Sequence, residues 1–364
     1  MYENKTVAVV VPAYNEETQI GMVIENMPWF VDRIIIVNDG SKDKTRDIVC
    51  MYIEKDKEMQ TVIPWRQKVV SDSVYDRADV ILEEMRLREE KAYAIQKIYN
   101  DNETDRIVLI EQENSGVGSA IATGYKWCRD HNLDCTAVMA GDGQMDPAEL
   151  EDIIRPVCQE KIDYVKGNRL SHKAAKIMIP KQRHFGNSVL SLLTKIASGY
   201  WNVSDTQTGY TAISNYALNM ISIYDIYPSY GCPNDILIKL NIENCTIREI
   251  PIKPVYAVGE QSKMKIFKVI PTVSLLLVKG FFQRIVEKYF KRSFHPLFLF
   301  YMAGIGMMIL NVPVLVKIVV DVLIRNGSVT FGYYMVFILL TLFSFQSIGF
   351  AMWMDIQDNE KLSK

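Results

Sequence analysis

The sequence has few of the residues that form metal centres, disulfide frameworks or nucleic-acid binding surfaces. Its six cysteines include no CxxC pair, and its four histidines complete no zinc-ligand spacing. The 41 lysines and arginines are offset by 43 aspartates and glutamates, which gives a net charge of -2. We therefore expect reduced cysteines in a cytosolic domain and no nucleic-acid partner, because a nucleic-acid binder carries a basic surplus.

The N-terminal segment MYENKTVAVVV lacks the basic start, long apolar run and cleavage site of a signal peptide. Pro12 follows its short apolar run at once. We therefore expect the soluble part of the protein to lie in the cytosol. A chain of 364 residues is long enough for one domain with a full core and a smaller second unit.

Short apolar runs separated by helical intervals predict one α/β domain over residues 1–262. The runs VAVVVPAY (7–14) and DRIIIVNDGS (32–41) are apolar at successive positions, which is typical of parallel strands covered on both faces. A helix between two such strands predicts a right-handed crossover. Further strands are expected at 106–112, 135–142, 163–169 and 245–252.

Residues 51–106 interrupt this pattern with charge-dense sequence. The segment VILEEMRLREEKAYAIQKIY (80–99) has apolar residues at helical spacing and opposite charges four residues apart. This pattern predicts a helical insertion. It is either a solvated surface segment or an arm for regulation or oligomerisation.

The C-terminal part holds the apolar excess. Residues 263–292 alternate apolar blocks with lysine and arginine, which predicts interfacial amphipathic helices. Residues 296–316 and 331–353 carry no charge, and about 21 helical residues span about 31 Å, the thickness of a bilayer core. We therefore predict an integral membrane protein with two transmembrane helices within residues 293–354 and a tail at 355–364.

The flanking charges predict the orientation of this hairpin. Lys288, Lys291 and Arg292 precede the first span, whereas the loop around Arg325 has little positive charge. The positive-inside rule then places the soluble domain and both termini in the cytoplasm, at the cell membrane in a prokaryote. Lys317 and Asp321 lie one turn apart and are expected to pair near the far interface.

Two polar motifs end neighbouring strands, at the edge where open α/β sheets bind ligands. They are VPAYNEE (11–17) and VNDGSKDKT (37–45). Asp39 is placed to accept hydrogen bonds from a nucleobase. Asp43 and Thr45 are expected to cap the next helix instead.

A third motif, AGDGQMDP (140–147), follows the predicted strand at 135–142. Asp142 stands between glycines that leave backbone room for a bulky ligand, and Gln144 lies two residues further on. A carboxylate and an amide oxygen suit Mg²⁺ or Mn²⁺, which would in turn hold a diphosphate. Asp146, before Pro147, is expected to cap the following helix.

These motifs resemble the family 2 glycosyltransferases with the GT-A fold, and among them the polyprenyl-phosphate glycosyltransferases, a group that includes dolichol-phosphate mannose synthase. The resemblance covers nearly the whole soluble domain apart from the insertion. It also rests on NSGVGSAIATGY (114–125), GNR (167–169), DTQTGY (205–210) and EQSKMK (260–265).

The resemblance implies a role for each matching residue. The nucleoside of a UDP- or GDP-linked sugar would be held by Pro12, Ala13, Tyr14, Glu16 and Asp39. Asp142 and Gln144 would contact the metal ion and the diphosphate. Arg169 and Arg183 would bind the acceptor phosphate, since the planar fork of arginine suits phosphate oxygens. Arg183 could equally form a surface salt bridge. Asp142, Arg169 and Arg183 are thus the expected catalytic residues.

The implied reaction transfers a sugar from a nucleotide sugar to undecaprenyl or dolichyl phosphate at the cytoplasmic face of the membrane, with a metal ion and with inversion. The sequence departs from the family pattern at Ala140, where many relatives have an acidic residue. The arginine that relatives often carry just before the EQSKMK segment is also absent, since Tyr256, Ala257 and Val258 directly precede Gly259. Its absence weakens a phosphate-binding role for Lys263.

Two other functions remain open. A processive polysaccharide synthase shares the GT-A domain, but its QxxRW motif does not occur in this sequence. A catalytically silent, membrane-bound protein that binds a sugar nucleotide or a lipid is suggested by Ala140 and by the insertion. A homo-oligomer is compatible with either function.

Overall fold

The computed structural model describes residues 1–56, 95–102, 104–173, 181–255, 266–324 and 329–364, with isolated positions at 77, 80–81, 84–85, 93 and 175. Of residues 181–188, 266–269 and 324 only the backbone is described. Most of the predicted insertion and the segment EQSKMK lie outside the described residues.

The centre of the molecule is an eight-stranded sheet with the order β3-β4-β2-β1-β5-β7-β6-β8. Strand β1 is parallel to β2 and β5, β2 is parallel to β4, and β6 is parallel to β8, whereas β3 and β7 are antiparallel to their neighbours. Six strands therefore end at the same edge. The strands are β1 (Val7–Ala13), β2 (Arg33–Asp39), β3 (Ile95–Tyr99), β4 (Ile107–Gln112), β5 (Cys135–Val138), β6 (Tyr164–Asn168), β7 (Thr211–Ser214) and β8 (Ile247–Pro251).

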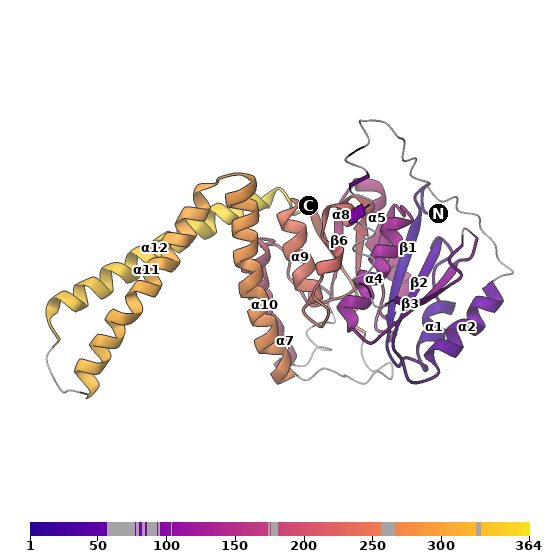
Figure 1. The fold of residues 1–364 in the computed structure, drawn as a ribbon, viewed down its shortest axis with the longest axis horizontal. Helices are drawn as coiled ribbons and strands as arrows, with labels where there is room; N and C mark the ends of the chain where they lie inside the picture. Colours follow the sequence, from indigo (N-terminus) through magenta and orange to yellow (C-terminus); the bar gives the residue numbers. More distant parts are fainter. Residues whose placement is uncertain are drawn as a thin grey trace.

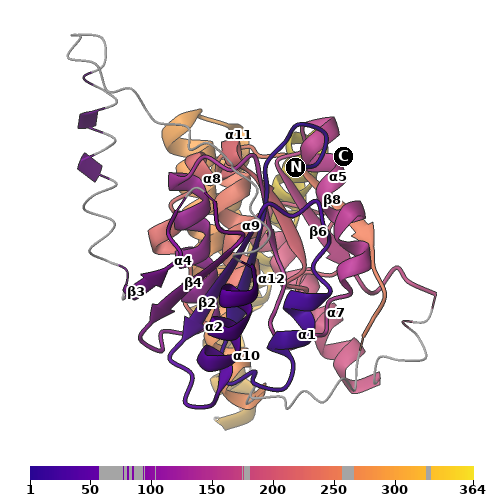
Figure 2. The same cartoon turned by 90° about the vertical axis from the view of Figure 1, so that its right-hand side faces the viewer.

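Helices cover both faces of the sheet, as continuous apolar strands require. One face packs on α1 (Ile20–Glu25), α2 (Thr45–Asp56) and α5 (Leu150–Glu160). The other packs on α4 (Val117–Asp130), α8 (Asn215–Met220) and α9 (Cys232–Ile242). Figure 2 shows α4 and α8 on one side of the sheet and α1 and α5 on the other. The predicted fold class, an α/β domain with a mostly parallel sheet, is confirmed.

Three details of the sheet differ from the prediction. Strand β5 ends at Val138 rather than at residue 142, because the chain enters a turn at Gly141, whose amide still donates to the Pro12 carbonyl oxygen of β1 (3.2 Å). Strand β7 was not predicted, since four residues are too few to show a period. Strand β3 lies inside the insertion that was expected to be helical, and its Ile95 and Ile98 pack against the core beneath it.

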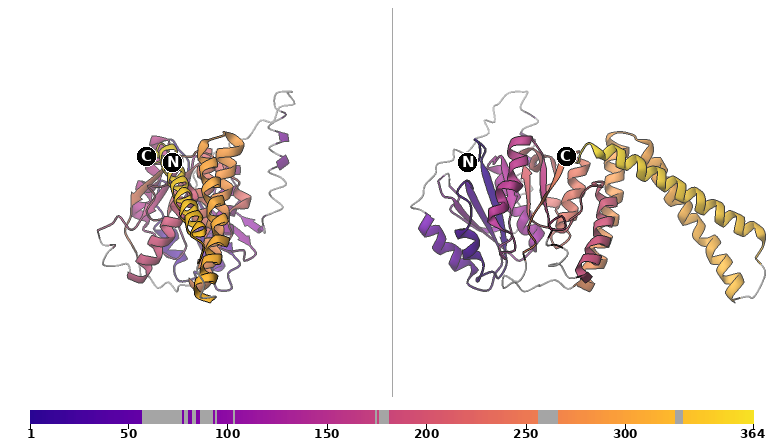
Figure 3. Two further views of the ribbon diagram at one scale, coloured as in Figure 1. Left: turned by 90° about the vertical axis from the view of Figure 1, so that its left-hand side faces the viewer. Right: turned by 180° about the vertical axis from the view of Figure 1, so that it is seen from behind.

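Two long helices, α11 (Pro296–Val319) and α12 (Phe331–Glu360), lie side by side and project away from the sheet (Figures 1 and 3). A π-helical turn (Val320–Ile324) extends α11. Both helices are long and apolar enough to cross a membrane, and the expected ion pair between Lys317 and Asp321 is present at 3.1 Å. They pack closely at Gly304, whose carbonyl accepts a hydrogen bond from Ser344 (2.7 Å).

The segment before this hairpin is one continuous helix rather than several. Helix α10 (Ile266–Val286) continues into a π-helical turn (Glu287–Arg292) and packs against α9 and α7 (Lys181–Ser198). Leu277 faces this packing and is buried, whereas Leu275 is 71% exposed. The inner face of this helix covers protein, and the interfacial position predicted for residues 263–292 stays a prediction.

Residues 355–364 do not form a free tail. Helix α12 continues to Glu360, and Leu362 is buried against the core. The Ile247 amide donates to the Leu362 carbonyl oxygen (2.7 Å), so the chain returns to the edge of the sheet beside β8. The physical reason is that the last turns of α12 carry polar side chains with buried partners, since Asp355 pairs with Arg284 and Asn359 accepts from Asn241 on α9 (2.8 Å).

Candidate active site

The predicted site residues other than Arg183 lie at one edge of the sheet, because the strands that precede them end there. Ala13 and Asp39 are the last residues of β1 and β2, and Arg169 directly follows β6. Asp142 follows β5 by four residues, next to the Gly141 amide that bonds the end of β1. Because β7 runs in the opposite direction, the loop before it, which carries Asp205, reaches the same edge.

The loops after β1 and β2 are locked together by hydrogen bonds between side chains and backbone amides. The Asn15 amide donates to Ser41 Oγ (2.9 Å), and the Lys42 amide donates to Asn15 Oδ1 (2.8 Å). The Glu16 amide donates to Thr45 Oγ1 (2.8 Å). Tyr14 and Glu16, both expected to contact the nucleoside, therefore sit in a rigid double loop.

Asp43 has the capping role that the sequence predicted, whereas the Thr45 hydroxyl accepts from the Glu16 amide of the neighbouring loop instead. Asp43 Oδ1 accepts hydrogen bonds from the backbone amide (3.0 Å) and the hydroxyl (2.6 Å) of Thr45, the first residue of α2. These hydrogen bonds, which favour the carboxylate, lower the pKa of Asp43 although its partial burial acts to raise it. The carboxylate thus stabilises the start of α2 rather than binding a ligand.

Asp39 is almost fully buried, and its carboxylate organises the loop that leads into α4. Oδ1 accepts from Gln112 Nε2 (2.8 Å) and from the Ser115 amide (2.8 Å), while Oδ2 accepts from the Gly116 amide (2.9 Å). A carboxylate has about four acceptor positions. The contact with a nucleobase that the resemblance implies would therefore be made through Oδ2.

We expect Asp39→Asn to raise the KM for the donor about 10-fold or more, with a smaller change in kcat. The new amide group would turn a donor toward one of the backbone amides, and an unmade buried hydrogen bond costs about 1–3 kcal/mol. Steady-state kinetics with varied donor concentration would measure this. Glu113→Gln, the same change at an exposed position of this loop, is the control and should leave the donor KM unchanged.

The AGDGQMDP turn is shaped around Asp142. Asp142 Oδ1 accepts a hydrogen bond from the Gln144 amide (3.0 Å), and Gly143 has a φ of 73°, which favours glycine. The hydroxyl of Tyr210 donates to the Asp146 carbonyl oxygen (3.0 Å), which ties this turn to the DTQTGY loop. Asp146 also accepts from the Ala148 amide (2.9 Å), so its predicted capping role is confirmed.

The oxygen donors of this turn fit a divalent cation that is shared with a substrate. Within the described ranges, no group of three or more His, Cys, Asp or Glu side chains could hold a metal ion alone. Mg²⁺ is commonly bound by one or two protein oxygens together with substrate phosphates. Asp142 and Gln144 can supply such oxygens, whereas Ala140 cannot, and its amide donates to Met145 Sδ (3.2 Å).

Arg169 is held by Asp205 in a two-pronged ion pair. Its Nε donates to Asp205 Oδ2 (2.8 Å) and its Nη2 donates to Oδ1 (3.0 Å). Burial acts to raise the pKa of Asp205, but the guanidinium of Arg169 outweighs this effect and the pKa is lowered. The residue expected to bind the acceptor phosphate is therefore oriented by a buried carboxylate, a partner to which the sequence analysis gave no role.

Two further charges lie behind this pair. Lys166 is fully buried in β6, and its ammonium group donates to the Thr208 carbonyl oxygen. Burial lowers the pKa of Lys166 to about 8, although Asp205 and Glu249 act to raise it. Glu249 accepts from the Ser204 (2.8 Å) and Asp205 (3.0 Å) amides. The only sequence signal was a lysine inside an apolar strand.

We expect the stability gap between wild type and Lys166→Met to change with pH. The folded state releases the Lys166 proton near pH 8, whereas the ordinary pKa of lysine is 10.5. Between these values the unfolded state binds more protons, so this group makes the free energy of unfolding rise with pH. When unfolding is measured in detergent from pH 7.5 to 10, the free energy of unfolding of wild type should rise relative to that of the variant. A constant gap would contradict the assignment.

The position of the second expected arginine is only partly described. Arg183 lies in the first turn of α7, and its side chain is outside the described residues, as is Lys263. Its role stays a prediction.

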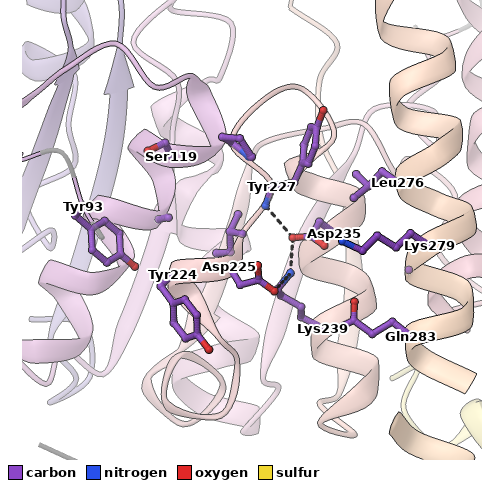
Figure 4. Close-up of a pocket in the computed structure, with 14 residues that line it drawn as sticks. Tyr93, Ser119, Tyr224, Asp225, Tyr227, Asp235, Lys239, Leu276, Lys279 and Gln283 are labelled. Carbon is purple, nitrogen blue, oxygen red and sulfur yellow. Dashed lines mark hydrogen bonds and ion pairs between the residues drawn. The ribbon is translucent and has the colours of Figure 1, made fainter. Parts of the chain in front are cut away.

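A cavity of about 350 Å³ lies beside the edge of the sheet and is lined by none of the predicted site residues (Figure 4). It is bounded by α4, α9, α10 and the segment 224–228. Figure 4 shows Asp235 at its centre, paired with Lys239 (2.6 Å) and bonded by the Tyr227 amide (2.9 Å). The amides of Gly118 (2.8 Å) and Ser119 (3.3 Å) donate to the Pro228 carbonyl oxygen, so the segment 224–228 contacts the first turn of α4.

A comparison of the sequence with known families gives a match that includes the loops at this edge. Residues 8–70 and 88–221, more than half of the chain, match glycosyl transferase family 2. The chain belongs to this family. The matched residues include the loops after β1 and β2, the AGDGQMDP turn and the DTQTGY loop, and the fold observed is the GT-A fold that the resemblance implied.

Relatives of this family 2 glycosyltransferase have named activities. A UDP-N-acetylglucosamine–dolichyl-phosphate N-acetylglucosaminyltransferase of Methanococcus voltae is 29% identical over 70% of this chain and 87% of the relative. A dolichyl-phosphate beta-glucosyltransferase of Trichomonas vaginalis is 24% identical over 76% of this chain and 74% of the relative. Among solved structures, glucosyl-3-phosphoglycerate synthase of Mycobacterium tuberculosis with Mn²⁺ and uridine diphosphate is similar, with a TM-score of 0.47 and 16% identity over 77% of this chain and 80% of that one.

Proposed function

We propose that this glycosyltransferase moves a sugar from a nucleoside diphosphate sugar to a polyprenyl phosphate at the cytoplasmic surface of the membrane. The observation that carries the proposal is that one chain joins a family 2 glycosyltransferase domain to a pair of helices long and apolar enough to cross a membrane. The named activities of the Methanococcus voltae and Trichomonas vaginalis relatives support the acceptor class.

The donor would bind across the ends of β1, β2 and β5. Pro12, Ala13 and the double loop would hold the ribose and base, with Asp39 Oδ2 accepting from the base. The short distance between the Pro12 carbonyl and the Gly141 amide brings this subsite directly beside Asp142. The diphosphate would therefore lie over the AGDGQMDP turn.

Asp142 and Gln144 would hold a Mg²⁺ or Mn²⁺ ion together with the diphosphate. When bound, the ion would neutralise the charge that develops on the leaving nucleoside diphosphate. Asp142 keeps its carboxylate directed by the hydrogen bond from the Gln144 amide, and Gly143 gives the backbone room beside it.

The acceptor phosphate would not need to be deprotonated by the enzyme. The second pKa of a phosphate monoester is about 6, so the attacking oxygen is already anionic at neutral pH and no general base or nucleophilic side chain is required. Arg169, oriented by Asp205, and Arg183 would align that oxygen with the anomeric carbon. Direct attack opposite the leaving group gives inversion.

The acceptor would arrive from the membrane. Helices α11 and α12 would span the bilayer with both termini in the cytoplasm, and the outer faces of α7 and α10 would lie at its surface. Leu192 on α7 is 54% exposed and Leu275 on α10 is 71% exposed. An apolar face of this kind, next to a spanning hairpin, suits the headgroup boundary where a prenyl phosphate lies.

The test is to incubate the purified full-length protein in lipid nanodiscs with undecaprenyl or dolichyl phosphate and a panel of radiolabelled UDP- and GDP-sugars. One donor should give an organic-extractable, mild-acid-labile product that requires a divalent cation. If no donor gives a lipid-linked product while nucleotide sugars still bind, the catalytically silent protein suggested by Ala140 would be the better description.

A further inference from the structure

The join between the soluble domain and the membrane hairpin contains a buried ion pair. Arg284 on α10 and Asp355 on α12 have side chains with no solvent exposure, and they meet at two points. Nη1 donates to Oδ1 (2.7 Å) and Nη2 donates to Oδ2 (2.9 Å). Asp355 lies beyond the uncharged part of α12, in the turns that return to the domain.

The same guanidinium also holds the end of α7. Its Nε donates to the Ala197 carbonyl oxygen (2.9 Å) and its Nη2 to the Ile196 carbonyl oxygen (3.1 Å). These carbonyls belong to the last turn of α7, where they have no partner within the helix. Gly199, next along the chain, lies so close that an added Cβ would stand 2.6 Å from Nη1. Arg284 therefore links α7 to α12 and is closely packed against the backbone at Gly199.

Further contacts fix α12 to the rest of the domain. Lys288 donates to Asn241 on α9 (3.1 Å) and to Asn359 on α12 (2.8 Å). The hydroxyl of Tyr289 donates to Asp355 Oδ1 (3.1 Å). Together with the backbone pairing beside β8, these bonds connect α12 to α7, α9, α10 and the sheet.

We propose that Arg284 is a positioning residue, which sets the height and direction of α7 relative to the membrane hairpin. Helix α7 has 18 residues and so forms a rod about 27 Å long. Arg284 holds its C-terminal end, and its first turn carries Arg183. A fixed angle between α7 and α12 therefore fixes where an acceptor phosphate, anchored by its lipid chain, meets the site. This inference rests on the proposed function.

Stability alone does not explain this pair. A buried ion pair is commonly no more stabilising than well-packed apolar side chains of similar volume. Its distinctive property is a geometric one, because a two-pronged pair with two additional carbonyl acceptors permits a single arrangement of three helices.

The test is the double variant Arg284→Met/Asp355→Leu, which replaces both members of the ion pair by apolar side chains, so that neither is left without its partner. With full-length polyprenyl phosphate in nanodiscs, kcat/KM for the acceptor should fall about 10-fold or more. With a short, water-soluble prenyl phosphate in detergent, kcat/KM should stay within about twofold of wild type, because a soluble acceptor can approach at any height. The donor KM should not change.

The matched control is Glu287→Leu/Lys291→Met, which removes an exposed ion pair (2.7 Å) one turn further along the same helical segment. It should behave as wild type with both acceptors. A second variant, Arg284→Lys, keeps the charge but cannot bridge Asp355 and the α7 carbonyls at once, and it should show the same acceptor-selective loss. An equal loss with both acceptors, or no loss with either, would overturn the proposal.

A distance measurement separates this inference from the proposed activity. Spin labels attached through non-natural amino acids at the exposed positions Leu192 on α7 and Phe345 on α12 should give a narrow distance distribution in wild type. The distribution should broaden in Arg284→Met/Asp355→Leu and not in the control. An unchanged distribution would overturn the positioning role. If the distribution broadens in the double variant but the wild type makes no lipid-linked sugar, only the proposed function would be refuted.

Discussion

Asp142→Asn is expected to reduce sugar transfer about 10³-fold at saturating donor and acceptor. Loss of the carboxylate removes the anionic ligand proposed for the cation, because Asp146, the other carboxylate of the AGDGQMDP turn, caps the next helix. Charge stabilisation of a leaving group contributes about 4 kcal/mol. Initial rates at several Mg²⁺ and Mn²⁺ concentrations would measure the change. Part of the loss should be recovered at high metal concentration.

The control for this prediction lies four residues further on. Asp146→Asn makes the same chemical change at a residue that caps the next helix and pairs with Lys253 (3.1 Å). We expect it to cost about 1 kcal/mol of stability and little activity. If Asp142→Asn transferred sugar at the wild-type rate with the same metal requirement, the proposed metal site would be wrong.

Arg169→Lys is expected to lower kcat/KM for polyprenyl phosphate about 10²-fold while the donor KM stays within about twofold. Lysine keeps the charge but cannot contact both oxygens of Asp205 and still present a planar face to a phosphate, and each charge-assisted hydrogen bond contributes about 1.5–3 kcal/mol. Varying the acceptor at saturating donor, and then the reverse, separates the two constants.

Arg155→Lys serves as the comparison, because Arg155 forms a half-exposed pair with Asp152 (2.6 Å) away from the strand ends. It should leave both constants unchanged. A variant at Arg169 that weakened donor and acceptor use equally would indicate that the Arg169–Asp205 pair supports the fold of the site rather than the acceptor phosphate.

The sequence predicted the parts of the fold that depend on local pattern. Both predicted runs contain successive apolar residues, at 7–13 and at 34–37, and the strands that they form are buried on both faces. The capping roles of Asp43 and Asp146 follow from short-range chemistry, namely an acceptor placed just before a helix. The location of the predicted site residues at one edge follows from parallel strand direction alone.

The parts that could not be predicted depend on contacts between residues far apart in the chain. Arg169 and Asp205 are separated by 36 positions, and Arg284 and Asp355 by 71. No local pattern identifies such partners. Strand β3 was interpreted as helix because its sequence shares the spacing of the charged segment before it. Residues 355–364 were interpreted as a tail because a polar end after an apolar helix gives no sign of where it docks.

The most direct test of the central claim is to identify both products of the reaction. The purified protein, polyprenyl phosphate and the active nucleotide sugar should yield a prenyl monophosphate sugar by mass spectrometry, with one nucleoside diphosphate released for each lipid-linked sugar. Release of nucleoside monophosphate with a prenyl diphosphate sugar, or release of nucleoside diphosphate without any lipid product, would contradict transfer to a polyprenyl phosphate oxygen.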